Sequence, residues 1–136
     1  MYKRQVNALL TLLQDDNSDL RGIAADALGR LGKKSSEEVV NALLPLLRDE
    51  NYSVRCSAGN TLSKLGKNSE DVVNALLPLL RDENYFVRSS AADALGELGK
   101  KSDQILPQVI EWIQKHQDSE YLGTSIDLLW DLVVGK

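Results

Sequence analysis

The feature that most constrains the fold of this chain is an internal repeat. Residues 39–55, VVNALLPLLRDENYSVR, recur at residues 72–88 with a single difference. A more divergent copy, VNALLTLLQDDNSDLR, runs over residues 6–21. A second apolar segment follows each copy and ends in Leu-Gly. Such a repeat predicts one small structural unit used several times, because a single unit cannot bury its own apolar face.

Each unit is predicted to contain two helices. Apolar residues recur at steps of three and four in both halves of the unit, as on one face of a helix. No segment alternates apolar and polar residues over the length of a strand, so we expect an all-α fold. The residues that carry this pattern in the second unit are Val39, Val40, Leu43, Leu44, Leu46 and Leu47, then Val54, Ala58, Leu62 and Leu65.

Turn signals divide the chain into helices. Asparagines are predicted between the paired helices, glycines at helix C-caps, and serines at N-caps. They are, in that order, Asn17, Asn51 and Asn84; Gly32, Gly66 and Gly99; and Ser35 with Glu38 in a capping box, Ser69 and Ser102. We therefore predict one domain over residues 1–136, with repeats at about 2–32, 35–66, 69–99 and 102–134.

The last unit departs from the pattern. If its turn holds one extra residue, Leu122 falls where the other units have arginine. We predict that Trp112 and Trp130 close the end of the core there. The first and last helices lack a neighbour on one side, so weak end-to-end self-association is also expected.

Composition restricts the kinds of partner. The chain has a formal net charge of -4 and a pI near 5.0, which argues against a broad nucleic-acid surface. No apolar stretch approaches the roughly 20 residues of a membrane span. Cys56 is the only cysteine, which excludes an internal disulfide and favours a reducing cytoplasm. We expect a cytoplasmic protein that binds neither nucleic acid nor membrane.

Signals for catalysis or cofactor binding are weak. GKKS at 32–35 and GKNS at 66–69 lack the upstream glycine of a phosphate-binding loop and follow helices, so they are predicted to be linkers. His116 is the only histidine and has no cysteine at ligand spacing. We therefore predict no catalytic residues, no cofactor and no metal.

Three Asp-x5-Arg pairs precede the second helices and carry a family resemblance. With the following Ala-Leu-Gly or Thr-Leu-Ser segment, the closing Leu-Gly, and prolines at Pro45 and Pro78, they make the chain similar to HEAT repeats. The resemblance is to the phycobilisome-lyase type of HEAT-like repeat in particular. The pairs are Asp15 and Arg21, Asp49 and Arg55, and Asp82 and Arg88.

The resemblance implies an all-α fold, a right-handed α-solenoid (αα-superhelix) of four helical hairpins. It implies that the six Asp and Arg residues form a structural ladder between adjacent repeats. It also implies that the second helices line the concave face and that the protein is a non-enzymatic scaffold. Each proline inside a first helix implies a bend there.

A protein or peptide partner is predicted to bind where otherwise copied units differ. These positions lie on the second helices, with aromatic side chains just before them as candidate anchors. The aromatic residues could equally pack on a neighbouring turn, and the acidic positions could be a solvated face or favour a basic peptide. The candidate residues are Tyr52, Asn60, Lys64, Tyr85, Phe86, Ser89, Asp93, Glu97, Asp26 and Arg30.

Two other functions stay open at this stage. The family resemblance also implies a bilin lyase-related, chromophore-handling protein, for which Cys56 would be the candidate attachment point. The near identity of the two central units is equally expected of a designed or consensus repeat scaffold without a native partner. The chain could also be a segment of a larger protein.

Overall fold

The computed structural model describes residues 2–31, 37–65, 70–118 and 120–134, and these contain helices and turns but no β-strand. This confirms the all-α prediction. The first unit comprises α1 (Tyr2–Leu12) and α2 (Ser18–Leu31), and the last comprises α7 (Ile105–Lys115) and α8 (Leu122–Val134). Gly32, Ser35, Gly66 and Ser69 lie outside the described residues, as do the repeat boundaries predicted there.

The two central units share one construction. In the second unit, α3 (Glu37–Leu43) continues into a 3-10 helix, η1 (Leu44–Arg48), before α4 (Tyr52–Leu65). In the third, α5 (Glu70–Leu76), η2 (Leu77–Arg81) and α6 (Tyr85–Gly99) follow the same order. The change from α-helix to 3-10 helix falls at the proline of each unit, because proline has no N–H for the α-helical hydrogen bond.

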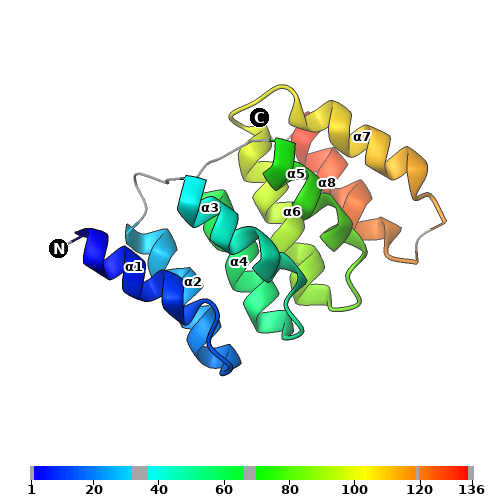
Figure 1. The fold of residues 1–136 in the computed structure, drawn as a ribbon. Helices are drawn as coiled ribbons and strands as arrows, with labels where there is room; N and C mark the ends of the chain where they lie inside the picture. Colours follow the sequence, from blue (N-terminus) through cyan, green and yellow to red (C-terminus); the bar gives the residue numbers. More distant parts are fainter. Residues whose placement is uncertain (1, 32–36, 66–69, 119, 135–136) are drawn as a thin grey trace.

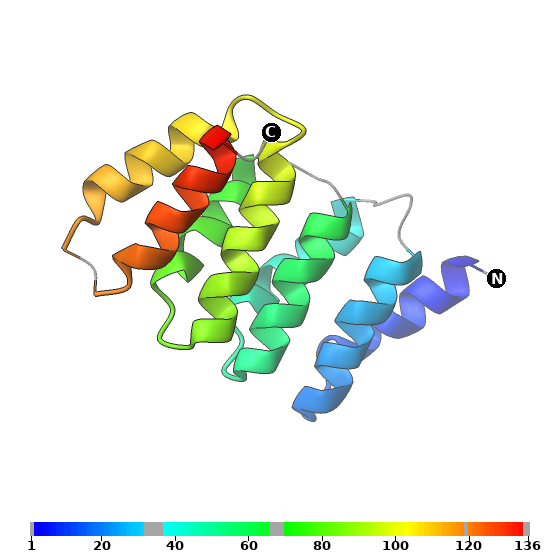
Figure 2. The same ribbon diagram turned by 180° about the vertical axis from the view of Figure 1, so that it is seen from behind.

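The helices stack in two layers (Figures 1 and 2). Each second helix packs on the next one, so α2, α4, α6 and α8 lie side by side. Within a unit, α1 packs on α2, η1 on α4, η2 on α6 and α7 on α8. This is the solenoid arrangement that the repeat predicts; its right-handedness stays a prediction.

The core runs between the two layers through the repeated apolar positions. Leucines of the first and second helices are fully buried against small residues such as Ala58 and Ala91. Largest among these buried side chains are Leu28, Leu43, Leu47, Leu62, Leu76, Leu80, Leu95 and Leu98. One continuous cluster therefore links all the units.

Three local predictions are wrong. Gly99 is the last residue of α6 and is buried, and Lys100 at the C-cap is right-handed (φ -68°, ψ -21°). A Cβ at position 99 would come too close to Leu132 Cδ2, so a larger residue there would require the Leu132 side chain to shift. Ser102 is not an N-cap: α7 begins at Ile105, and the Ser102 hydroxyl accepts a bond from the Gln104 N–H (3.2 Å) in the preceding turn.

The third concerns the last unit. Trp112 packs partly against the core and stacks on His116, with 3.6 Å between ring centroids. Trp130, however, is 66% exposed on the outer face of α8. Only one of the two tryptophans therefore helps to close the core, because the positions of α8 that face inward are Ser125, Leu128 and Leu132.

Candidate interaction surface

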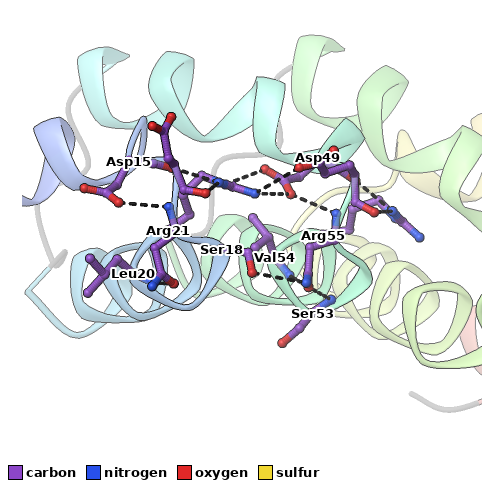
Figure 3. Close-up of polar contacts among 12 residues, drawn as sticks. Asp15, Ser18, Leu20, Arg21, Asp49, Ser53, Val54 and Arg55 are labelled. Atoms are coloured by element: carbon purple, nitrogen blue, oxygen red, sulfur yellow. Dashed lines mark hydrogen bonds and ion pairs between the residues drawn. The ribbon is translucent and has the colours of Figure 1, made fainter.

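The first rung between units joins α2 to the turn that follows η1. Arg21 Nε donates to Asp49 Oδ2 (2.9 Å) and Nη2 donates to Oδ1 (3.0 Å), a two-point contact between planar groups. Arg21 Nη1 donates to the carbonyls of Asp15 (2.8 Å) and Asp16 (3.0 Å) in the turn between α1 and α2. Figure 3 shows the arginine lying between Asp15 and Asp49. One side chain therefore closes its own turn and holds the next unit.

The environment stabilises the charged form of both partners. Burial acts to raise the pKa of the Asp49 carboxyl, but hydrogen bonds from Arg21 and from the Asn51 N–H, with the nearby guanidinium charges, outweigh it. The pKa of Asp49 therefore lies below its ordinary value. The same hydrogen bond raises the pKa of Arg21. Both side chains are about nine-tenths buried, so solvent screens this pair much less than an exposed one.

The second rung joins the equivalent residues, with one side-chain hydrogen bond where the first has two. Arg55 Nη2 donates to Asp82 Oδ1 (3.1 Å), with Nε 3.0 Å from Oδ2, and Arg55 Nη1 donates to the Asp49 carbonyl (2.7 Å). The turn asparagines complete the arrangement. Asn51 and Asn84 each donate their N–H to the preceding aspartate and accept from the first N–H groups of α4 and α6. The same turn geometry in both units thus places each carboxylate.

The third arginine ends the series differently. Arg88 Nη1 donates to the Asp82 carbonyl (2.7 Å), but the C-cap position taken by Asp49 and Asp82 is occupied in the last unit by His116. The Arg88 guanidinium instead lies over the Tyr121 ring, 4.0 Å from its centroid. Within the described residues, buried Arg88 Nε has no hydrogen-bond partner, which is also true of Arg55 Nε. A cation–π contact therefore stands where the other units have an ion pair.

Four of the predicted partner-binding residues meet in one groove between α4 and α6. Its volume is about 430 Å³. The groove carries two acidic and two basic side chains, so it is polar rather than acidic. Its lining is Asn60, Ser63, Lys64, Asp93, Ala94, Glu97 and Lys101. Ser63 and Lys101 were missed from the sequence, although Ser63 stands where the first and third units have glycine.

The three aromatic candidates form a second group at the start of α4 and α6. The Phe86 ring lies 6.5 Å from Tyr52 and 5.7 Å from Tyr85, measured between centroids. Tyr85 and Phe86 are 62% and 63% exposed, and Tyr52 is exposed as well. Phe86 therefore lies beside a tyrosine of each unit, and all three rings keep large exposed surfaces.

The remaining candidates belong neither to the lining of the groove nor to the aromatic group. Ser89 is half-buried on α6, and Asp26 is exposed on α2. Arg30 lies at the end of α2 and lines a hollow between α1 and α2 instead of the groove. The structure thus divides the predicted set into a groove, an aromatic group and three outlying residues.

Other chemistry finds little support in the described part of the chain. No group of three or more His, Cys, Asp and Glu side chains is placed there to hold a metal ion. No described helix is both long and apolar enough to cross a membrane. Cys56 is half-buried, and burial raises the pKa of its thiol, which disfavours the reactive thiolate.

The family model described as HEAT repeats matches this chain twice, over residues 6–76 and 65–130. The chain belongs to the HEAT repeat family. These HEAT repeats resemble a chain in the structure of the complex of CpcE and CpcF of phycocyanin lyase from Nostoc sp. PCC7120. The sequences are 29% identical, the TM-score is 0.67, and the match covers 79% of this chain and 41% of that one.

A crystal structure of an engineered protein matches more of the HEAT repeats at lower identity. The match covers 93% of this chain and 62% of that one, with 19% identity and a TM-score of 0.65. Because the identity is low, this match supports the fold and nothing about function. This chain therefore spans less than two thirds of both structures. No curated protein sequence matches it.

Proposed function

We propose that this HEAT repeat chain is a non-enzymatic, cytoplasmic scaffold that binds a protein or peptide segment along α4 and α6. The observation that carries the proposal is the groove between these helices. Asn60, Lys64, Asp93 and Glu97 line it, and all four occupy positions where otherwise copied units differ. Buried positions are constrained by packing, whereas such exposed ones can vary without cost to the fold.

The aromatic group supplies the anchor of the proposed site. Phe86, Ser89, Asp93 and Glu97 follow one another at helical steps of three and four, so they share one face along α6. This face spans about 16 Å, the length of roughly five residues of extended chain. We infer that a short extended segment places an apolar side chain on Tyr52, Tyr85 and Phe86 and polar side chains in the groove.

A peptide library displayed on phage and selected on the purified chain tests this proposal. Selected peptides should bind Phe86→Ala and Asp93→Lys at least about tenfold more weakly than the unmodified chain. Asp16→Lys, the same charge reversal on the turn before α2, is the matched control and should leave affinity unchanged. Equal affinity for all three variants would move the binding surface away from α4 and α6.

The similarity to a chain of the phycocyanin lyase complex favours a second candidate, a role in handling a bilin chromophore. The half-buried Cys56 thiol, with its raised pKa, counts against covalent attachment in this state. Adding a free bilin to the chain separates the two functions. A shifted visible absorption band that survives denaturation and is lost in Cys56→Ser would establish the second candidate, and an unchanged spectrum would reject it.

A further inference from the structure

The contact between α6 and α8 shows how one unit receives the next. On the side of α6 towards α8, the small residues Ala92, Gly96 and Gly99 line a hollow together with Asp93, Glu97 and Lys100. A Cβ at Gly96 would lie 3.8 Å from Leu128 Cδ1, and one at Gly99 would collide with Leu132 Cδ2. Small residues on the receiving helix therefore accommodate large apolar residues of the following helix.

The corresponding receiving face of the last unit is uncovered and bulky. Counting from Arg88 and Leu122, the positions of Ala92, Gly96 and Gly99 correspond to Ile126, Trp130 and Val133 in α8. These three side chains are more than half exposed. In the described part of the chain, this face of α8 is therefore an exposed apolar ridge, where α6 has small residues.

The opposite end of the stack has a matching hollow. The positions of Leu128, Asp131 and Leu132 correspond to Ala27, Arg30 and Leu31 in α2, the face that would meet a preceding unit. With Gln5, Ala8 and Leu9 of α1, these residues line a nearly apolar hollow of about 450 Å³. Small Ala27 stands where α8 has leucine, so the hollow lies where an internal contact has a large side chain.

We propose that a second copy of this chain docks head to tail, with Trp130 of one copy in the hollow between α1 and α2 of the next. In the α6–α8 contact the small residues lie on the first helix and the large ones on the second. In the proposed contact the large Trp130 lies on the first helix and the small Ala27 on the second, so the two surfaces are still complementary. The docking continues the stack in the register of its own internal interface, and it covers apolar surface that is otherwise in water at both ends.

Charge along the second helices supports the same pairing. The row that ends each second helix reads Arg30, Lys64, Glu97 and Asp131, basic in the first two units and acidic in the last two. Lys64 and Glu97 already line one groove inside the stack. In a head-to-tail contact, Asp131 would meet Arg30 of the next copy, again an acid beside a base.

The predicted interface is heterologous, because the two surfaces differ, so association produces open chains or rings instead of a closed dimer. Sedimentation velocity from micromolar to submillimolar concentration should show growth of the unmodified chain beyond a dimer. Trp130→Ser introduces the residue that the second unit has at this position and should raise the dissociation constant at least about tenfold. Phe86→Ala, which removes an equally exposed ring elsewhere, is the control and should not change it.

Mixing two half-blocked variants gives the decisive result. Trp130→Ser blocks one end and Ala27→Arg blocks the other, so each variant alone should stay monomeric. Together they should form a one-to-one dimer and nothing larger. Circular dichroism checks that both variants fold, and Arg30→Glu and Asp131→Arg, each weakening on its own, should restore association when combined in one chain.

Three outcomes would overturn the proposal. If the chain stays monomeric at submillimolar concentration, a second copy does not bind the exposed faces of α2 and α8. A dimer of Ala27→Arg alone indicates that Trp130 pairs with itself across a two-fold axis. Association that survives Trp130→Ser in a folded variant uses another surface. Because these tests do not involve the α4–α6 groove, their failure leaves the proposed peptide site standing.

Discussion

Asp49 makes hydrogen bonds both to the first unit and within its own turn in the second unit. Its carboxylate accepts from Arg21 of the preceding unit and from the Asn51 N–H, while its carbonyl accepts from Arg55. Removing the charge leaves the mostly buried guanidinium of Arg21 facing an uncharged amide. Removing one partner of a buried ion pair lowers the free energy of unfolding strongly, because the other charge stays buried without a partner. Replacing both partners by apolar residues has a much smaller effect.

We predict that Asp49→Asn lowers the free energy of unfolding by about 2 kcal/mol, since a charged hydrogen bond in a largely buried setting is lost. Urea denaturation followed by circular dichroism measures the change. Glu111→Gln removes the exposed ion pair with Lys115 and should have little effect. If both variants have the same urea midpoint of unfolding as the unmodified chain, the ion pair between Arg21 and Asp49 does not stabilise the stack.

The same carboxylate predicts a pH dependence. The pKa of Asp49 is lower in the folded chain than in the unfolded one, where it is about 3.9. The unfolded state therefore binds more protons, and the stabilisation is fully present above that value. It is lost as pH falls through the folded pKa.

The difference in unfolding free energy between the unmodified chain and Asp49→Asn should therefore stay constant from neutral pH to about pH 5 and shrink below about pH 4. Urea titrations of both proteins across this range provide the measurement. A difference that grows on acidification would contradict the assignment.

The space beside two helical glycines shows how closely the second helices of the units are packed. A Cβ on Gly59 of α4 would lie 3.9 Å from Leu47 Cδ2 and from Leu76 Cδ2, an ordinary contact. A Cβ on Gly29 of α2 would lie 3.2 Å from Thr61 Cγ2. Thr61 cannot easily retreat, because its buried hydroxyl donates to the Ala25 carbonyl of α2 (2.9 Å). The two helical glycines therefore differ in the space beside them.

We predict that Gly59→Ala stabilises the chain by about 1 kcal/mol, the helix-propensity difference, because alanine fits without displacing a neighbour. The first and third units already have alanine there, at Ala25 and Ala92. Gly29→Ala is the matched comparison and should gain less or be destabilising. Equal gains in thermal unfolding would show that α2 and α4 separate readily.

At the scale of the whole molecule, stability should vary along the stack because each unit contacts only its neighbours. The helices α4 and α6 are covered on both sides, by α2 and by α8 respectively as well as by each other. In contrast, α1 packs mainly on α2, and α8 has the exposed face of Trp130. The ends are therefore expected to open more often than the middle.

Hydrogen exchange measured by mass spectrometry should show the slowest exchange in α4 and α6 and the fastest among the helices in α1 and α8. Dilute protein gives the intrinsic order. At high concentration, protection should rise selectively in α1, α2 and α8 if copies dock head to tail. A uniform exchange rate across all helices would indicate a single cooperative unit instead.

The repeated units, the all-α class and the positions that line the core could all be predicted from the sequence. The predictions succeed because helical periodicity is local and because near-identical copies must adopt the same structure. Asp15, Asp49 and Asp82 could be recognised as recurring in the same place by the same reasoning. The groove residues Asn60, Lys64, Asp93 and Glu97 stood out because they vary inside copied units.

The tertiary structure alone decided what each residue faces. Gly99 is the last residue of α6 and not a left-handed cap, and it is buried beside Leu132 of another helix. Trp130 carries an apolar side chain at helical spacing and yet is 66% exposed, because its face of α8 is left uncovered by the described part of the chain. Arg88 lies over the Tyr121 ring, because position 116 holds histidine where the other units have aspartate. The sequence determined the unit, and the contacts between units determined which surfaces remain open.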